Sequence, residues 1–157
     1  MAIDGAQTAA GTKLYIGGTG VLASESAWVE VGEIVDIQGD IGKVFNEITH
    51  NPLGSRATEI FKGAFRVNVG PISLAQNMSN AGQTAVAAAL ELDSDYNFKI
   101  EQNDADTTTS PDGAPTTHAF KAKVMSFPTQ IGQVDTIVGR TLTLGVKSDS
   151  YTLTAAD

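Results

Sequence analysis

The chain has 157 residues, a formal net charge of −8 and no cysteine. This length suits one domain that buries roughly 70% of its unfolded surface around a single core. The negative charge disfavours nonspecific binding to nucleic acid or to an anionic membrane surface, and the absence of cysteine excludes disulfides, thiolate zinc sites and thiol nucleophiles.

The N-terminal segment, residues 1–13, lacks the basic region and the apolar core of a secretion signal. No apolar run in the sequence approaches the ~20 residues that span a bilayer. We therefore expect a soluble protein made in the cytoplasm, with a flexible N-terminus over residues 1–10.

Most of the chain alternates apolar and polar residues with a period of two, which is typical of half-buried antiparallel strands. In the segment 64–69, for example, Phe65 and Val67 share one face and Arg66 takes the other. The dipeptide 70–71, Gly-Pro, should interrupt the sheet with a bulge or an edge. The predicted strands are 13–16, 28–37, 43–48, 64–69, 96–101, 119–124, 135–138 and 141–146.

Two segments break this alternation. Residues 80–92 have helical spacing, and Asn80 followed by Gln83 resembles a capping box. The apolar face of this helix is narrow, so it should cover an edge or an end of the sheet. Residues 102–117 are rich in Thr, Asp and Pro and predict a mobile hairpin loop. The expected fold is a single domain over 1–157, an antiparallel β-sandwich or barrel with one short flanking α-helix.

The segment 47–65 gathers a histidine, an arginine and two glutamates, side chains that could perform acid–base chemistry or clamp a phosphate. Of these, His50, Arg56 and Glu59 would need a second shell of residues to hold them within ~3 Å of one another. The sequence supplies none, and 52–54 has the composition of an exposed turn. We therefore expect a contact-making loop and no catalytic residue.

Other motifs give weaker signals. The glycine-rich segment 17–20 follows a strand, but no helix follows it to bind a phosphate. Asp104, Asp106 and Asp112 loosely resemble a calcium loop that lacks its closing glutamate. His118 opens an alternating strand, where a histidine at the rim of the sheet is expected. The sequence therefore predicts no metal site, no cofactor and no enzyme activity.

The many short strands leave sheet edges that a protein must either blunt or pair with another chain. The polar stretch 47–65 would then be a long extension between two strands, available to reach a neighbouring copy.

Five sequence blocks occur in an order that resembles the major tail tube proteins of long-tailed bacteriophages. They begin with "GTKLYIGG" and "WVEVGEIVDIQG", continue through the 47–65 stretch and an Ala-rich helix after Asn80 and Gly-Gln, and end with two alternating strands over 120–146. The resemblance covers roughly residues 11–150. The chain departs from the family at 65–68, where an Asp-Gly turn is commoner, and in its longer loop at 102–117.

The resemblance implies a virion protein that self-assembles into stacked hexameric rings, which form a hollow tube for DNA ejection. Its implied partners are further copies of itself and the tape measure, tail terminator and tail tip proteins, with assembly in the cytoplasm of the host bacterium. Six chains would carry 6 × −8 = −48 charges per ring. Acidic groups facing the lumen would let DNA pass without specific binding. Edge strands that pair between subunits would close a continuous sheet around the lumen.

By analogy with the family, the arm at residues 49–61 would contact a neighbouring subunit or the next ring. Pro52 and Leu53 would form an apolar anchor, with Arg56 and Glu59 as a polar rim. The predicted contact residues are Thr49, His50, Asn51, Pro52, Leu53, Arg56 and Glu59.

Three alternatives stay open at this point. The same fold could serve as a tube or ring subunit of a contractile tail, a gene-transfer particle or a secretion system. A β-sandwich module that binds carbohydrate or protein would normally show several exposed aromatics, whereas aromatic residues are 6% of this chain and fall mostly on predicted apolar faces. An enzyme is the third alternative, and no motif supports it.

Overall fold

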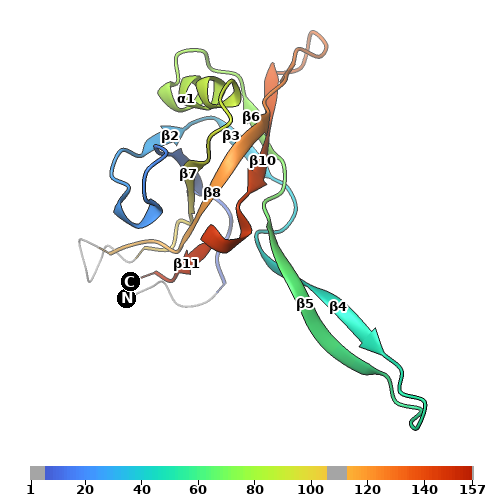
Figure 1. The fold of residues 1–157 in the computed structure, drawn as a ribbon. Coiled ribbons are helices and arrows are strands. Elements are labelled where there is room, and N and C mark those ends of the chain that lie inside the picture. Colours follow the sequence, from blue (N-terminus) through green and yellow to red (C-terminus); the bar gives the residue numbers. More distant parts are fainter. Residues whose placement is uncertain (1–5, 106–112, 157) are drawn as a thin grey trace.

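The computed structural model describes residues 6–105 and 113–156. The fold is mainly β with one short α-helix, α1 (Ala81–Leu90) (Figure 1). Its strands are β1 (Lys13–Ile16), β2 (Val29–Val31), β3 (Ile34–Ile37), β4 (Gly42–His50), β5 (Glu59–Asn68), β6 (Ile72–Ala75), β7 (Tyr96–Glu101), β8 (Thr117–Ser126), β9 (Thr129–Gln130), β10 (Gly139–Val146) and β11 (Thr152–Thr154). Short 3₁₀ turns occupy Leu22–Ser24 and Ser148–Ser150.

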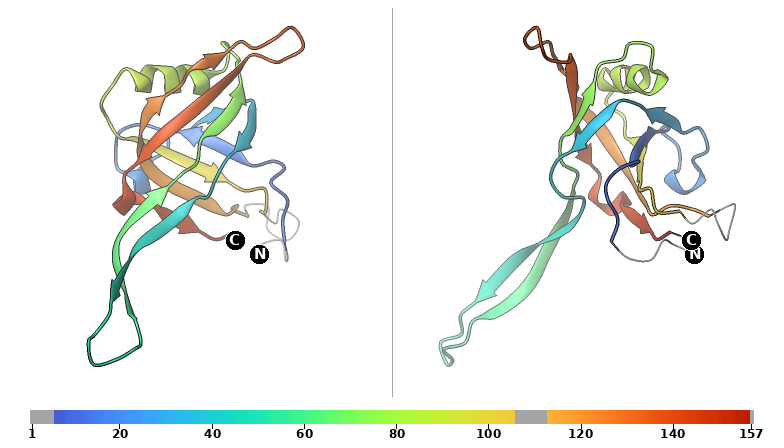
Figure 2. Two further views of the ribbon diagram at one scale, coloured as in Figure 1. Left: turned by 90° about the vertical axis from the view of Figure 1, so that its right-hand side faces the viewer. Right: turned by 180° about the vertical axis from the view of Figure 1, so that it is seen from behind.

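The main sheet is antiparallel and curls back on itself. Its strand order is β2-β1-β7-β8-β10-β6-β3, with β11 added beside β8 and β9 beside β10. The two ends of this order, β2 and β3, are separated in the chain only by Gly32 and Glu33, so the sheet must bend round to bring them together (Figure 2). The register between β10 and β8 shifts at one point, because Thr143 lies opposite Ser126 and the next residue, Leu144, lies opposite Val124, which leaves one extra residue in β8 as a β-bulge.

The predicted mainly β, antiparallel fold with one flanking helix is therefore confirmed. Within the described residues no hydrogen-bonded pairing joins β2 to β3, so the sheet is open along this seam and does not form a closed barrel. The predicted strand 28–37 is split in two, because the chain turns at Glu33, which has a positive φ of 64°.

The core lies inside the curled sheet and comes from the alternation seen in the sequence. Each of the strands β1, β7, β8 and β10 turns every second residue inward, and Phe98 and Phe120 stack there with ring centroids 6.0 Å apart. The buried residues of these four strands include Leu14, Ile16, Phe98, Ile100, Phe120, Ala122, Val124, Leu142 and Leu144.

One predicted strand, 135–138, is wrong. This segment forms a turn, in which Thr136 N–H donates to the carbonyl of Gln133 at 3.1 Å and its hydroxyl donates to the same carbonyl. Ile137 is exposed there. A β-branched run predicts a strand only where a neighbouring strand is present to pair with it, and this loop projects beyond the sheet (Figure 2).

The helix covers one end of the curled sheet, as predicted, and packs against β1, β2 and β8. Asn80 is its N-cap, and its Oδ1 accepts a hydrogen bond from Gln83 N at 3.0 Å. The buried Gln83 side chain does not return to the cap as in a full capping box. Its amide instead donates to the carbonyls of Ala75 (2.9 Å) and Gly32 (3.2 Å), which fastens the helix to the turn between β2 and β3.

Candidate assembly interface

The most conspicuous feature of the molecule is a β-hairpin that projects from the body. Within residues 6–105 and 113–156, strands β4 and β5 pair only with each other, in a two-stranded sheet separate from the main one. They extend away from the main sheet in every view (Figures 1 and 2). We call residues 42–68 the arm. At ~3.3 Å per residue, its strands reach roughly 30 Å. The predicted extension at 47–65 lies within this arm.

The register of the arm defines two faces. Pairing runs from Gly42 opposite Asn68 to Phe45 opposite Phe65, and then resumes at Glu47 opposite Lys62. Between these points β5 has one more residue than β4, which is a β-bulge. Because directly opposed residues point to the same side, the first face carries Lys43, Phe45, Glu47, Thr49, Ile60, Lys62 and Phe65, and the second carries Val44, Ile48, His50, Glu59, Phe61 and Arg66.

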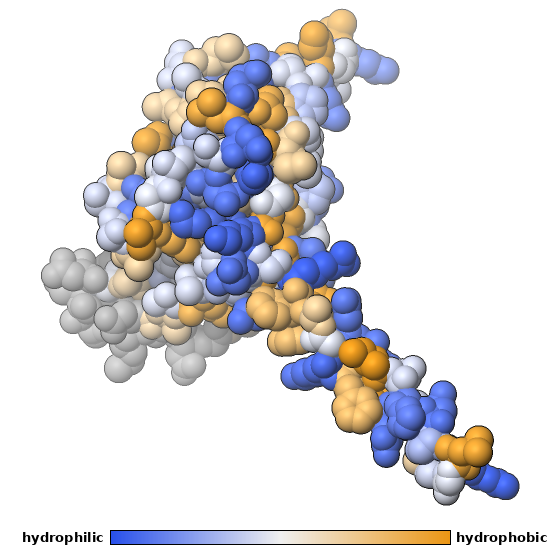
Figure 3. All heavy atoms as spheres, in the orientation of Figure 1, coloured by the Kyte–Doolittle hydropathy of each residue, from blue (hydrophilic) through white to orange (hydrophobic). Residues whose placement is uncertain are grey.

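Both faces carry exposed apolar side chains. Ile60 on the first face is 65% exposed and Phe61 on the second is 53% exposed, while Leu53 at the tip is fully exposed. Hydrophobic and hydrophilic residues are interspersed along the arm (Figure 3). A two-stranded hairpin has no core of its own and is marginally stable in water, and contiguous exposed apolar surface marks interaction sites. The arm therefore has the composition of a surface that another chain covers.

Two of the four cations of the arm, Lys43 and Lys62, lie over its aromatic rings. Phe45 and Phe65 pack against each other with centroids 5.4 Å apart. The ammonium of Lys43 lies 5.1 Å from the Phe65 centroid, and that of Lys62 lies 5.0 Å from the Phe45 centroid. Within the described residues the ion pairs are Lys99–Glu101 and Lys123–Asp93. The arm therefore presents positive charge with no carboxylate partner in its own described chain.

The seven predicted contact residues all lie at the far end of the arm. His50 and Glu59 face each other as the last pair of the ladder. Beyond them the turn is closed by a hydrogen bond of 2.7 Å from Thr58 Oγ1 to Asn51 Oδ1. Thr49 is the second-last residue of β4, and Pro52, Leu53 and Arg56 are in the tip itself. All except the half-buried Pro52 are exposed, and an acid–base site would need packed neighbours to hold its geometry.

The other candidate groups have structural roles. The Asp104 carboxylate accepts hydrogen bonds from Thr116 N (2.7 Å) and Thr116 Oγ1 (2.5 Å), and these bonds lower its pKa. Asp106 and Asp112 lie outside the described residues. Residues 1–5 of the predicted flexible N-terminus (1–10) and residues 106–112 of the predicted loop (102–117) also lie outside them. Across residues 6–105 and 113–156, no three acidic or histidine side chains gather as metal ligands would. Among the same residues no helix has both the length and the apolar character needed to cross a bilayer.

The glycine-rich turn 17–20 and the histidine also belong to the scaffold. Gly18 N donates to Glu25 Oε2 at 2.8 Å, so a carboxylate takes the position that a phosphate would need. His118 lies on β8 with its Nδ1 2.9 Å from the Tyr151 hydroxyl, and partial burial lowers its pKa. This contact joins β8 to the segment that leads into β11.

Glu25 makes the stability of this region depend on pH. Its carboxylate accepts hydrogen bonds from Asn97 Nδ2 (2.7 Å), Ala27 N (2.9 Å) and Gly18 N, and the bond from Asn97 is the largest cause of its lowered pKa. A lowered pKa in the folded state stabilises the fold above the ordinary carboxyl pKa of about 4, and that stability is lost as the pH falls through the folded-state pKa.

We therefore expect Glu25→Gln to lower the thermal midpoint at pH 7 and to have a smaller effect at pH 3. Thermal unfolding at both values measures this. The control is Glu59→Gln on the exposed arm, which removes a carboxylate without removing these hydrogen bonds. An effect of Glu25→Gln that is the same at both pH values would contradict the assignment.

A groove of about 740 Å³ lies along the open seam of the sheet. One wall is the N-terminal segment 7–12, and the other is β3 with the residues that lead into the arm. Ile34, Ile37 and Ile100 line it with apolar side chains. Asp36 and Asp40 add carboxylates. Because β3 pairs only with β6 in the described chain, its other edge is free to accept a strand.

Sequence reasoning missed the apolar residues of the arm. The segment 43–48 alternates loosely, which favours a half-buried strand of the main sheet. A signal was nevertheless present, because adjacent apolar pairs, Val44-Phe45 and Ile60-Phe61, place apolar side chains on both faces of a strand. Such a strand needs cover on both sides.

Solved structures share this fold. The SPP1 tail tube matches with a TM-score of 0.59 and 15% identity, over 92% of this chain and 76% of that one. A chain in the structure of the PVC sheath/tube terminator, from an extracellular contractile injection system, matches with a TM-score of 0.65 and 11% identity, over 98% of this chain and 100% of that one. A chain of the anti-feeding prophage baseplate matches with a TM-score of 0.61 and 12% identity, over 98% of each.

No family model matches the sequence, and no curated protein matches it significantly. At 11–15% identity the likeness is one of fold. The resemblance to tail tube proteins stated from the sequence is thereby confirmed as a structural one, since the structural neighbours come from a phage tail tube and from contractile injection machines.

Proposed function

We propose that this chain is a structural subunit that self-assembles into stacked hexameric rings, which form the hollow tail tube of a long-tailed bacteriophage and conduct DNA during ejection. The observation that carries the proposal is the arm, a projecting hairpin with exposed apolar side chains on both faces, on a fold shared with the SPP1 tail tube. An arm of this kind is costly in water unless another molecule covers it.

The open sheet supports self-assembly as well. Among the described residues, β3 pairs only with β6 and the two-residue strand β9 pairs only with β10, so each has one unpaired edge. Pairing of such edges between neighbouring copies would extend the sheet around a ring and would remove the aggregation hazard of an exposed edge. The partners of the assembled tube would be the tape measure, tail terminator and tail tip proteins, and assembly would take place in the cytoplasm of the host.

The negative net charge of the chain supports a tube through which DNA passes. A ring of six chains carries 6 × −8 = −48 charges. Carboxylates on the lumen wall would repel the phosphates of DNA, so the DNA would slide without binding to the wall. This is the opposite of the basic surface that a nucleic-acid-binding protein presents.

A second candidate is the tube of a contractile injection machine. Two of the structural neighbours come from such machines and are matched over nearly their whole length. The same arm and the same sheet edges would serve there. A purified contractile sheath that binds the assembled tube would favour this candidate, and a tube that does not recruit sheath would favour the long-tailed phage.

Electron microscopy of the purified chain tests the proposal. We expect rings or hollow filaments in negative stain at high protein concentration, together with an oligomer in size-exclusion chromatography. A chain that stays monomeric at every concentration and salt tested would contradict self-assembly.

Removing the tip of the arm tests the predicted contact residues. We expect deletion of residues 51–55 to shorten the tubes and reduce their yield, because it removes the exposed Leu53 side chain and its neighbours. The tip projects away from the body (Figure 1), so the thermal midpoint should stay unchanged. Tubes of normal length and yield would show that the tip makes no contact.

A further inference from the structure

The groove along the seam has the properties of a binding site for a strand. Its floor is apolar, with half-buried Ile34, Ile37 and Ile41 beside buried Ile100. The free edge of β3 offers backbone N–H and C=O groups to an added strand. A strand bound here would cover the apolar floor and satisfy that edge at the same time.

The arm and the rest of the chain carry net charges of opposite sign. Residues 42–68 hold four Lys or Arg and two Glu, a net charge of 4 − 2 = +2, whereas the whole chain carries −8, so the rest carries −8 − 2 = −10. The stretch just before the arm, residues 14–41, holds five acidic residues and no Lys or Arg. The end of this stretch, residues 34–41, forms one wall of the groove. A basic arm and an acidic groove on one chain favour contact between different copies.

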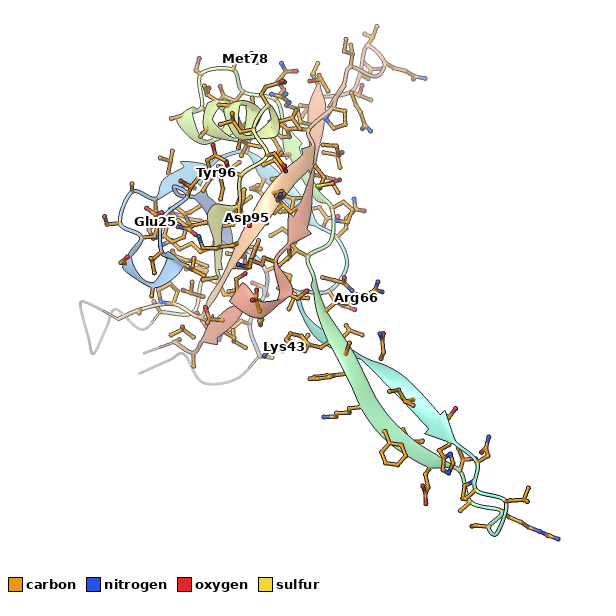
Figure 4. The ribbon with its side chains drawn as sticks, viewed as in Figure 1. Glu25, Lys43, Arg66, Met78, Asp95 and Tyr96 are labelled. Carbon is orange, nitrogen blue, oxygen red and sulfur yellow. The ribbon has the colours of Figure 1, made fainter. Side chains whose placement is uncertain are left out.

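The charged groups on both surfaces have no ion-pair partner within the part of the chain that the structure describes. Asp36 and Asp40 of the groove are exposed, and neither they nor Arg56 and Lys62 of the arm form an ion pair within the described residues. The arm does not lie in its own groove, because it begins at Gly42, directly after the groove wall, and from Lys43 and Arg66 at its base it projects away from the body (Figure 4). The base of the arm carries Lys43 and Arg66, whereas Lys62 and Arg56 lie farther along it. The outer half of the arm is therefore the part that can reach another copy.

We propose that the outer half of the arm of one copy binds in the groove beside β3 of a second copy, where Arg56 and Lys62 pair with Asp36 and Asp40. This inference rests on the self-assembly proposed above and identifies the partner surface. One face of the arm, with Ile60 or Phe61, lies on the isoleucine floor, and the opposite charges fix the register. The contact is heterologous, since arm and groove are different surfaces, so it propagates from copy to copy and does not stop at a dimer.

Charge reversal with rescue tests this pairing. We expect Asp36→Lys/Asp40→Lys to lower the assembled fraction by at least about tenfold, and Arg56→Glu/Lys62→Glu to do the same, because each places like charges opposite one another. The four substitutions in one chain should restore assembly. The matched control is Glu91→Lys/Asp149→Lys, which changes the net charge equally at exposed acidic residues outside the groove and the arm. Sedimentation and electron microscopy measure the assembled fraction.

Cysteine cross-linking provides a second test that does not depend on assembly yield. The chain has no cysteine of its own, so a chain with Asp40→Cys mixed with a chain with Lys62→Cys can form a disulfide only between copies. We expect the mixture to yield a cross-linked dimer under oxidising conditions. A mixture of Asp149→Cys with Lys62→Cys should yield far less.

The outcomes separate this inference from the proposed function. Wild-type tubes together with unaffected charge-reversal variants, or with no cross-link between positions 40 and 62, would overturn the arm-to-groove contact and leave the tube function standing. A wild-type chain that never assembles would overturn the proposed function, and the cross-link would still decide whether the two surfaces meet. Loss of assembly without rescue in the fourfold variant would also count against the pairing.

Discussion

Replacement of Gly70 by alanine is expected to destabilise the protein by about 3 kcal/mol, because overpacking against rigid backbone cannot be relieved by a side-chain movement. A methyl group at this position would overlap the carbonyl oxygen of Gln38 and lie 3.1 Å from the Cα of Gly39. Two chain segments cross here, one entering the arm and one leaving it. Gln38 N also donates to Pro71 O at 2.9 Å across the same crossing.

Thermal unfolding measures the effect. For a domain of about 150 residues, 3 kcal/mol corresponds to roughly 10 °C in the midpoint. The control is Gly20→Ala, since a methyl group there meets no atom within 4 Å. If Gly70→Ala and Gly20→Ala had equal midpoints, the close crossing would be wrong.

The crossing also sets the direction of the arm. β3 pairs with β6 up to Ile37 opposite Ile72, and the arm begins at Gly42 after the short segment 38–41. Because Gly39 has a positive φ of 74°, the chain can turn out of the sheet there without strain. The stability of the body and the position of the proposed assembly surface therefore depend on the same few residues.

The strands of the body were predictable because burial imposes the alternation that the sequence shows. The segment 96–101 turns Phe98 and Ile100 into the core and is a strand with the predicted bounds. The helix was predictable from its cap, since Asn80 accepts the hydrogen bond from Gln83 N that its spacing indicated. The strand was predictable because buried residues recur at every second position, and the helix because its cap is a hydrogen bond between residues three apart in the sequence.

The order in which the strands pair and the existence of the arm could be learned only from the structure. Alternation does not say which strands pair, and β4 and β5 pair with each other and leave the main sheet. The seam depends on the placement of β3 beside the N-terminal segment, which is distant from it in sequence. The strand predicted at 135–138 was wrong for the same reason. Its residues favour a strand, but no strand of the described chain lies beside them to pair with. The contact roles of Thr49, His50 and the tip residues stay predictions.

Replacement of three exposed apolar residues of the arm is expected to abolish tube formation. Ile48→Thr, Ile60→Thr and Phe61→Thr keep strand-forming residues and remove apolar surface from both faces of the arm. If each side chain loses about 1 kcal/mol of burial at a contact, one contact weakens by about 3 kcal/mol, or roughly 150-fold. In the proposed ring every subunit would make the same contact, so the losses would accumulate over the assembly. The measurement is the minimum protein concentration at which tubes appear.

The matched control is Val21→Thr, Leu92→Thr and Leu153→Thr. These residues are 67%, 54% and 58% exposed, compared with 52%, 65% and 53% for Ile48, Ile60 and Phe61, but they lie on the body. Both triple variants should keep the wild-type thermal midpoint, because the replaced side chains contribute little to the core. Only the arm variant should lose assembly. Equal losses in the two variants would mean that general surface hydrophobicity drives association, and the arm would then not be the assembly surface.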